Sequence, residues 1–135
     1  MRLALILVLT TGSATAQTCQ IDLAAVESRI AQLEPSYGLV LSDIGCDLPV
    51  NPAHILMCNA AETPNAPLWR MGRHDDLAWI YAVENATGQD IDETNPPRDQ
   101  DFLSRRDACT DEICLCETLI DHTNASLGGT SPYPQ

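Results

Sequence analysis

The feature that most limits how this chain can fold is its set of six cysteines, all of which follow an amino-terminal export signal. The signal has one arginine, an apolar run from Leu3 to Leu9 and a cleavage site of the A-x-A type at Ala14 to Ala16. The apolar run is too short to span a bilayer, and Gln17-Thr18 before Cys19 disfavours lipidation. An even number of cysteines in an oxidising compartment predicts up to three disulfides. We therefore expect a periplasmic or secreted protein without a membrane anchor in the mature chain.

The remaining chain has room for one domain with one modest core. We assign residues 1–16 to the signal peptide, residues 17–127 to a single helical domain and residues 128–135 to a flexible tail. The expected fold is all-α, a small disulfide-stapled helical domain with a proline-rich irregular loop.

Apolar periodicity predicts three helical regions. The first runs from Ile21 to Leu33, with Pro35 just beyond its end, and the second runs from about Leu68 to Ala86, with Gly88 as the glycine that follows it. The third starts near Arg98 and continues past Leu119. Residues 36–67 are irregular, with a weak strand signal in "YGLVL" and a short helical segment in "PAHILMCNA".

The segment "RRDACTDEICLCETL" places Cys109, Cys114 and Cys116 within eight residues. In one straight helix no two of these cysteines could form a disulfide, because they differ too much in direction or in height. A helix break with Thr110 as N-cap places Cys109 at N′ and Cys114 at N4, two positions that meet in a hydrophobic staple. We therefore expect a Cys109–Cys114 disulfide, whereas Cys116 must pair with Cys19, Cys46 or Cys58.

Metal and redox interpretations of this segment are weaker. The C-x4-C-x-C spacing is not that of a zinc site, although His122 lies six residues further on. Cys114 and Cys116 lack the strand-loop-helix context of a redox pair. We expect no metal and no cofactor.

The chain is strongly acidic and contains no lysine. Removal of Arg2 with the signal peptide changes the formal net charge from −12 to −13. This charge argues against binding to nucleic acid or anionic lipid, which need cationic patches. It favours a basic protein partner, or it serves only to keep the protein in solution.

The cysteine-rich segment also resembles the carboxy-terminal signature of the LprI-type lysozyme inhibitor family. That signature has an aromatic-Leu pair, an Arg-Asp-x-Cys motif and a Cys-Leu pair, which match Phe102-Leu103, Arg106 to Cys109 and Cys114-Leu115. Upstream, "CNAAETP" and "HDDLAWIYAVENA" resemble two further helical segments of the family. The resemblance covers roughly residues 58–127.

The departures from the family pattern bear on the remaining cysteines. Family members have a second cysteine about ten residues after the first, where this chain has Leu68-Trp69. Cys58 therefore needs a different partner, for which Cys46 across the proline-rich loop is the best candidate, and Cys19 is then left for Cys116. Residues 17–57 have no counterpart in the family, and the Tyr-x-x-Arg-Ile that follows Cys-Leu there is replaced here by residues around Ile120 to His122.

The resemblance implies an exported inhibitor or binding module for a basic wall-lytic enzyme of the lysozyme type. A lysozyme cleft carries two catalytic carboxylates, so the group inserted into it should be a cation or a hydrogen-bond donor. The candidates for partner binding are Trp69, Arg70, Arg73 and His74, with Arg105 and Arg106 as a second group. The alternative is an acidic envelope protein with a structural or small-ligand role and no lysozyme inhibition.

The sequence contains few residue patterns that could indicate catalysis. His74-Asp75-Asp76 and Asp121-His122 place imidazole beside carboxylate, but neighbours on a helix point in different directions, so we interpret them as solvated residues. The serines lack a nucleophile-elbow motif. We therefore expect no catalytic residues and a protein that is not an enzyme.

Overall fold

The computed structural model describes residues 19–135, and the expected signal peptide (residues 1–16) lies outside them. The elements are α1 (Leu23–Tyr37), α2 (Pro52–Glu62), α3 (Pro67–Thr87), α4 (Gln100–Asp107), α5 (Glu112–Leu127) and a short 3-10 helix, η1 (Gly128–Thr130). Residues 19–135 contain no β-strand. The predicted all-α, disulfide-stapled fold is therefore confirmed.

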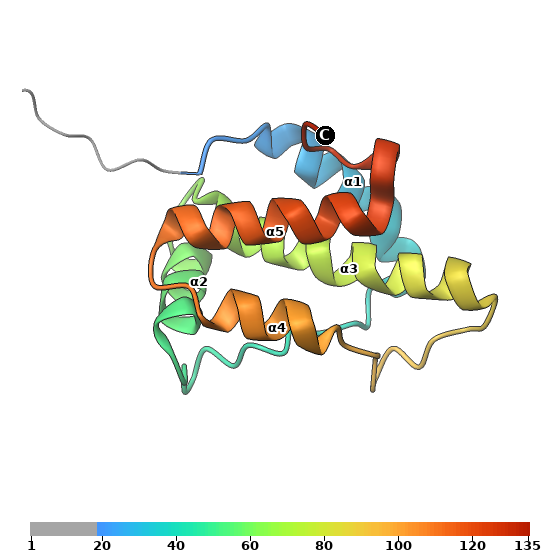
Figure 1. Cartoon of the computed structure of the whole chain (residues 1–135), viewed down its shortest axis with the longest axis horizontal. Helices are drawn as coiled ribbons and strands as arrows, with labels where there is room; N and C mark the ends of the chain where they lie inside the picture. The colour runs from blue at the N-terminus through green and yellow to red at the C-terminus, as the bar shows by residue number, and fades with distance from the viewer. Residues whose placement is uncertain (1–18) are drawn as a thin grey trace, which may run out of the picture.

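The long helix α3 lies at the centre of the molecule. It packs against α1 and α5 along much of its length, and α2 packs across its amino-terminal part (Figure 1). The buried side of α3 carries residues such as Met71, Leu77 and Ile80, which have almost no exposed surface. Pro67 lies at the start of the helix and Gly88, with φ 67°, ends it in the left-handed conformation that glycine adopts at low cost.

The first helix continues beyond the predicted end. Pro35 lies inside α1, which extends to Tyr37, although we predicted that the helix ends before this proline. The loss of one backbone hydrogen bond near the helix end is offset by the burial of Tyr37. The Tyr37 hydroxyl donates a 3.0 Å hydrogen bond to Glu84 on α3, and its ring meets Tyr81 edge to face.

The third helical region is broken, as predicted, but the cap is a different residue. Asp111, not Thr110, is the N-cap of α5, and its carboxylate accepts a 2.8 Å hydrogen bond from the Cys114 N–H. A carboxylate at this position also interacts favourably with the helix dipole, which explains why Asp111 takes the role. Cys114 is consequently at N3 and not at N4 as expected.

Three disulfides connect the helices and the loop. They are Cys19–Cys116, Cys46–Cys58 and Cys109–Cys114, the same pairs that the sequence suggested, and residues 19–135 contain no free cysteine. The first joins the segment before α1 to α5, the second joins the α1–α2 loop to α2, and the third spans the break between α4 and α5.

Two segments differ from the sequence interpretation. The "YGLVL" segment makes no strand: it forms the end of α1 and the start of the loop that then runs beneath α4 in Figure 1. Residues 128–135, expected as a flexible tail, turn back onto the domain, with Tyr133 buried and the Asn124 side chain donating to the Pro134 carbonyl at 2.9 Å. Burial of the Tyr133 ring supplies a reason for this return.

None of the helices within residues 19–135 combines the length and apolar character that crossing a bilayer requires.

Candidate functional site

The loop between α1 and α2 carries an unusual concentration of exposed apolar side chains. We call residues 38–50 the apolar loop. Leu39, Leu41, Leu48 and Val50 expose 69%, 72%, 79% and 73% of their surface, and Ile55 at the start of α2 is also exposed. Single exposed apolar residues are ordinary, but a group on one segment is typical of an interaction surface.

The apolar loop is anchored by the side chains that point inward. Val40 and Ile44 are buried in the core, so the neighbouring Leu39 and Leu41 are directed outward. The Ser42 hydroxyl accepts a 3.1 Å hydrogen bond from the Ile44 N–H, which closes a local turn. The exposure of the leucines is therefore a consequence of a fixed loop conformation.

Two arginines hold the backbone of the apolar loop. Arg73 on α3 donates to the carbonyl oxygens of Gly38, at 3.2 Å, and Val40. Arg98, just before α4, donates to the Leu41 carbonyl at 2.6 Å and to Asp76 at 3.1 Å. These charged donors satisfy loop carbonyls that no helix or sheet pairs.

A third arginine and a disulfide hold the second half of the loop. Arg106 on α4 donates two hydrogen bonds to the Asp43 carboxylate, at 2.8 and 2.7 Å, and also pairs with Asp107. Burial alone would raise the pKa of the Asp43 carboxyl, but the bonds from Arg106 keep that pKa below its ordinary value. The Cys46–Cys58 disulfide then ties the loop to α2.

A pocket opens between the apolar loop, α2 and α3. Its volume is about 190 Å³, and its lining residues are Leu41, Ser42, Met57, Trp69, Gly72, Arg73 and Asp76. Leu41 belongs both to the exposed group and to the pocket wall, so the pocket adjoins the first half of the apolar loop.

Asp76 is the acidic group of this pocket. Burial raises its pKa to about 7, and the neighbouring Asp75 carboxylate acts in the same direction, whereas Arg98 opposes the rise. The ion pair with Arg98 thus offsets only part of the cost of burying the charged carboxylate.

The six predicted partner-binding residues occupy very different positions. Trp69 and Arg73 line the pocket, and Arg70 forms a two-bond ion pair with Glu27, at 2.7 Å for each bond. His74 is fully buried and Arg106 is almost so, which corrects their interpretation as contact residues. Their positions follow from the packing of α3 and from the pairing of Arg106 with Asp43.

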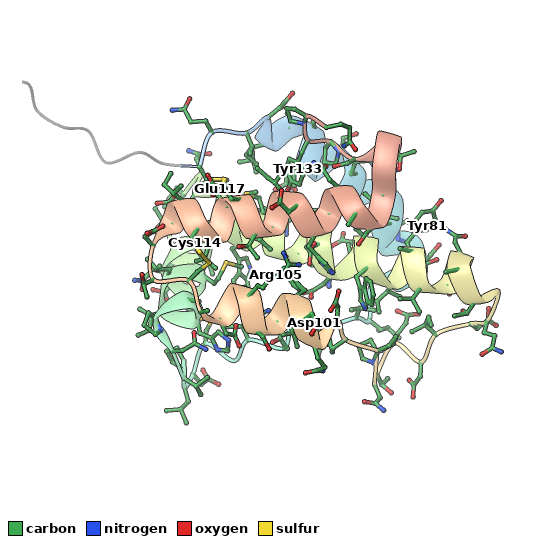
Figure 2. All side chains as sticks on the ribbon, viewed as in Figure 1. Tyr81, Asp101, Arg105, Cys114, Glu117 and Tyr133 are labelled. Atoms are coloured by element: carbon green, nitrogen blue, oxygen red, sulfur yellow. A yellow bond between two sulfur atoms is a disulfide. The ribbon has the colours of Figure 1, made fainter. Side chains whose placement is uncertain are left out.

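Arg105 is the exception among the arginines. It is exposed on α4 (Figure 2), and its side chain makes no hydrogen bond or ion pair with any residue between 19 and 135. Arg105 therefore stays a candidate for contact with a partner.

Asp75, His122 and Thr123 form a buried polar group between α3 and α5. His122 Nδ1 lies 2.8 and 2.9 Å from the two Asp75 oxygens, and the Thr123 hydroxyl donates to Asp75 at 2.9 Å. Burial raises the pKa of the Asp75 carboxyl, and the bonds from His122 and Thr123 counteract part of that rise. We interpreted Asp75 and His122 as solvated residues, and that interpretation was wrong.

The surroundings of this group make its role structural. The His122 ring stacks on Phe102, with ring centroids 3.8 Å apart, and Trp79 packs nearby. Its Nε2 is 3.3 Å from Asp99 without the geometry of a hydrogen bond. Because Asp75, His122 and Thr123 are all buried, a substrate cannot reach them in this conformation.

Comparisons with known proteins leave the family open: no family model, no curated protein and no solved structure matches this chain. Within the described part of the chain, no three histidine, cysteine or acidic side chains are grouped so as to hold a metal ion. The resemblance to LprI-type inhibitors remains a prediction from the sequence.

Sequence reasoning missed the apolar loop as a surface. A signal was present, because Leu39 and Leu41 flank Val40 in an alternating pattern, and Leu48 and Val50 lie within a proline-containing segment. It also missed Asp43 and Arg98, whose importance depends on contacts with residues far away in the chain.

Proposed function

We propose that this protein is an exported binding protein that recognises a basic partner protein through the apolar loop, and that the partner is a wall-lytic hydrolase of the lysozyme type. The observation that carries the proposal is the fixed apolar loop, on which four side chains stay exposed although three arginines and a disulfide hold the loop in place. A preorganised loop loses little conformational entropy on binding, which favours affinity.

The net charge supports a basic partner. A mature chain of formal charge −13 attracts a cationic protein over long range and raises the rate of encounter, and the effect weakens as salt is added. Asp47 lies exposed within the apolar loop, whereas the Asp43 carboxylate is paired with Arg106. The loop thus combines apolar contact area with the charge that a basic surface prefers.

The choice of a lysozyme-type partner rests on the sequence resemblance together with Arg105. An inhibitor of such an enzyme presents a cation or hydrogen-bond donor to the carboxylates of the cleft. Arg105 is exposed and has no partner among the side chains of residues 19–135, so its donors are available. The neighbouring Arg106 binds Asp43 on the apolar loop, which ties the helix that carries Arg105 to that loop.

The test uses oxidised, signal-free protein with hen-type and goose-type lysozymes. We expect slower lysis of bacterial walls in a turbidity assay, and a complex by calorimetry that is weaker at physiological salt than at low salt. Leu41→Ser and Leu48→Ser should each weaken the complex at least fivefold, whereas the control Tyr81→Ser, at an exposed apolar position on α3 outside the loop, should not. Absence of both complex and inhibition at either salt concentration would favour the acidic envelope protein without lysozyme inhibition.

A further inference from the structure

The pocket beside Leu41 has the size of a single side chain. Its volume of about 190 Å³ is below the roughly 300–1000 Å³ of ordinary ligand pockets. It opens on the surface formed by the apolar loop, because Leu41 belongs to both. Pockets of this kind at an interface receive anchor residues of the partner.

The lining combines an apolar wall with one carboxylate. Leu41, Met57 and Trp69 supply the apolar contacts, and Asp76 supplies the acidic group. Within residues 19–135, the Asp76 side chain accepts a single hydrogen bond, to Oδ1 from Arg98. A carboxylate has about four acceptor positions, so Asp76 retains capacity for another donor.

We propose that this pocket receives one lysine or arginine side chain of the partner, whose apolar stem packs on Leu41, Met57 and Trp69 and whose cationic head donates hydrogen bonds to Asp76. The inference rests on the proposed function, in that it names the anchor of a basic partner. Long cationic side chains commonly bury the stem in this way, and Trp69 adds an aromatic face to which a cation is attracted.

The ionised form of Asp76 is incompletely stabilised. Burial is the main cause that raises its pKa to about 7, with Asp75 and Asp43 acting in the same direction and Arg98 and Arg106 in the opposite one. An additional cationic donor would stabilise the ionised carboxylate in this poorly hydrated position. The positive charge of Arg73 in the wall is offset in part by Glu34, whose carboxylate lies 3.5 Å away, and its guanidinium is turned to two loop carbonyls.

Gly72 keeps the pocket open. It lies within α3, where glycine costs roughly 1 kcal/mol relative to alanine. A Cβ at this position would lie 2.5 Å from Cε of Met57, which is also a lining residue. Gly72→Ala would therefore displace the flexible Met57 side chain and change the pocket without unfolding the helix.

The direct test is a titration of the oxidised protein with n-butylguanidinium and n-butylammonium, followed by NMR. We expect saturable shifts of the Gly72 amide and the Trp69 indole, with n-butanol and n-butyrate binding at least tenfold more weakly. Affinity for the cations should rise about tenfold from pH 6 to pH 8 as Asp76 ionises. Equal binding of butanol, or an absence of saturable binding by both cations, would overturn the proposal.

Variants separate the pocket from the wider surface. Asp76→Asn should abolish the preference for cations, whereas Asp121→Asn, the same change at an exposed site on α5, should preserve it. Gly72→Ala should weaken binding of the two cations at least fivefold although Asp76 is retained. This variant keeps the test valid if Asp76→Asn fails to fold. Unchanged cation binding in Gly72→Ala would contradict the assignment.

The same variants distinguish the two proposals. If butylguanidinium binds as expected but no lysozyme does, the pocket assignment stands and the proposed partner is rejected. If a lysozyme binds with the same affinity to wild type and to Gly72→Ala, the partner stands and the pocket assignment is rejected.

Discussion

His122 on α5 and Asp75 on α3 form a buried polar pair, with His122 Nδ1 2.8 Å from the nearer Asp75 oxygen and both side chains at most 5% exposed. The two residues are 47 positions apart in the chain, and each comes from a helix that packs on the other. Because the hydroxyl of Thr123 also donates to Asp75, the carboxylate is well supplied with donors in the centre of the domain. The pair connects α3 to α5 by a buried polar contact.

Removal of Asp75 should therefore be costly. Asp75→Ala leaves the His122 and Thr123 donors buried without an acceptor, and we expect a loss of roughly 3–5 kcal/mol in the free energy of unfolding. Urea denaturation measures this. The exposed Asp121→Ala, next to His122 in the chain, should change stability by less than about 0.5 kcal/mol. A loss below about 1 kcal/mol for Asp75→Ala would show that the pair contributes little.

His74 should make the protein sensitive to acid. Neither ring nitrogen has a hydrogen-bond partner within the described residues, and burial lowers the pKa from 6.5 to about 4. The unfolded chain binds this proton at a higher pH than the folded chain, so stability falls as the pH drops from about 6.5 towards 4. His74→Phe preserves an aromatic ring against Tyr133. When the pH is lowered from 8 to 5, its free energy of unfolding should rise by about 2 kcal/mol relative to that of the wild type.

The comparison must be made between the two proteins at each pH. The raised pKa of Asp76 acts with the opposite sign, because the folded state then binds the proton more tightly and stability falls as the pH rises from about 4 to 7. Asp76 is common to both proteins, so its contribution cancels in the difference. A difference between them that does not vary with pH would contradict the assignment to His74.

The contribution of each disulfide to the free energy of unfolding should increase with the length of the loop that it closes. The sequence separations are 97 for Cys19–Cys116, 12 for Cys46–Cys58 and 5 for Cys109–Cys114. The chain-entropy model predicts that the free energy of unfolding falls by about 5, 3 and 2 kcal/mol, in that order, when each pair is replaced by serines. Thermal and urea unfolding of the three double variants test the order, and a greater loss for Cys109–Cys114 than for Cys19–Cys116 would contradict it.

Arg98 should control the conformation of the apolar loop. Arg98→Gln removes the ion pair to Asp76 and weakens the bond to the Leu41 carbonyl. We expect hydrogen exchange at the Val40 and Ile44 amides to quicken at least tenfold, because a bond from a charged donor contributes about 1.5–3 kcal/mol. Arg105→Gln, which removes no side-chain hydrogen bond or ion pair within residues 19–135, is the control. Equal exchange rates in both variants would mean that the loop does not depend on Arg98.

Part of this structure could be predicted because it depends on local chemistry. The apolar spacing within α3, the proline at its start and the glycine after its end lie within one segment, so they identify the helix without knowledge of its neighbours. The break before α5 was likewise visible, because Thr110 and Asp111 both suit an N-cap. Because the two residues are alike in this respect, the sequence does not distinguish Asp111, the actual cap, from Thr110.

The candidate site lay beyond local reasoning. We predicted that Asp75 and His122 are exposed, because each pairs in the sequence only with a helical neighbour that points in a different direction. The packing of α5 on α3 buries both. The sequence suggested Arg73 as a partner-binding residue and gave Arg98 no role beyond the start of a helical region. Each in fact donates to the backbone of a loop more than thirty residues away.

The sequence by itself determined an all-α, disulfide-linked domain, since helical periodicity, caps and the number of cysteines are properties of short segments and of composition. Only the tertiary structure decided which charged groups are buried in pairs and which apolar side chains remain outside. That outcome depends on free energies of burial and pairing between distant residues, as in the bond from Arg98 to Leu41 that fixes the wall of the pocket. No local pattern encodes such a contact, because each partner alone is compatible with several environments.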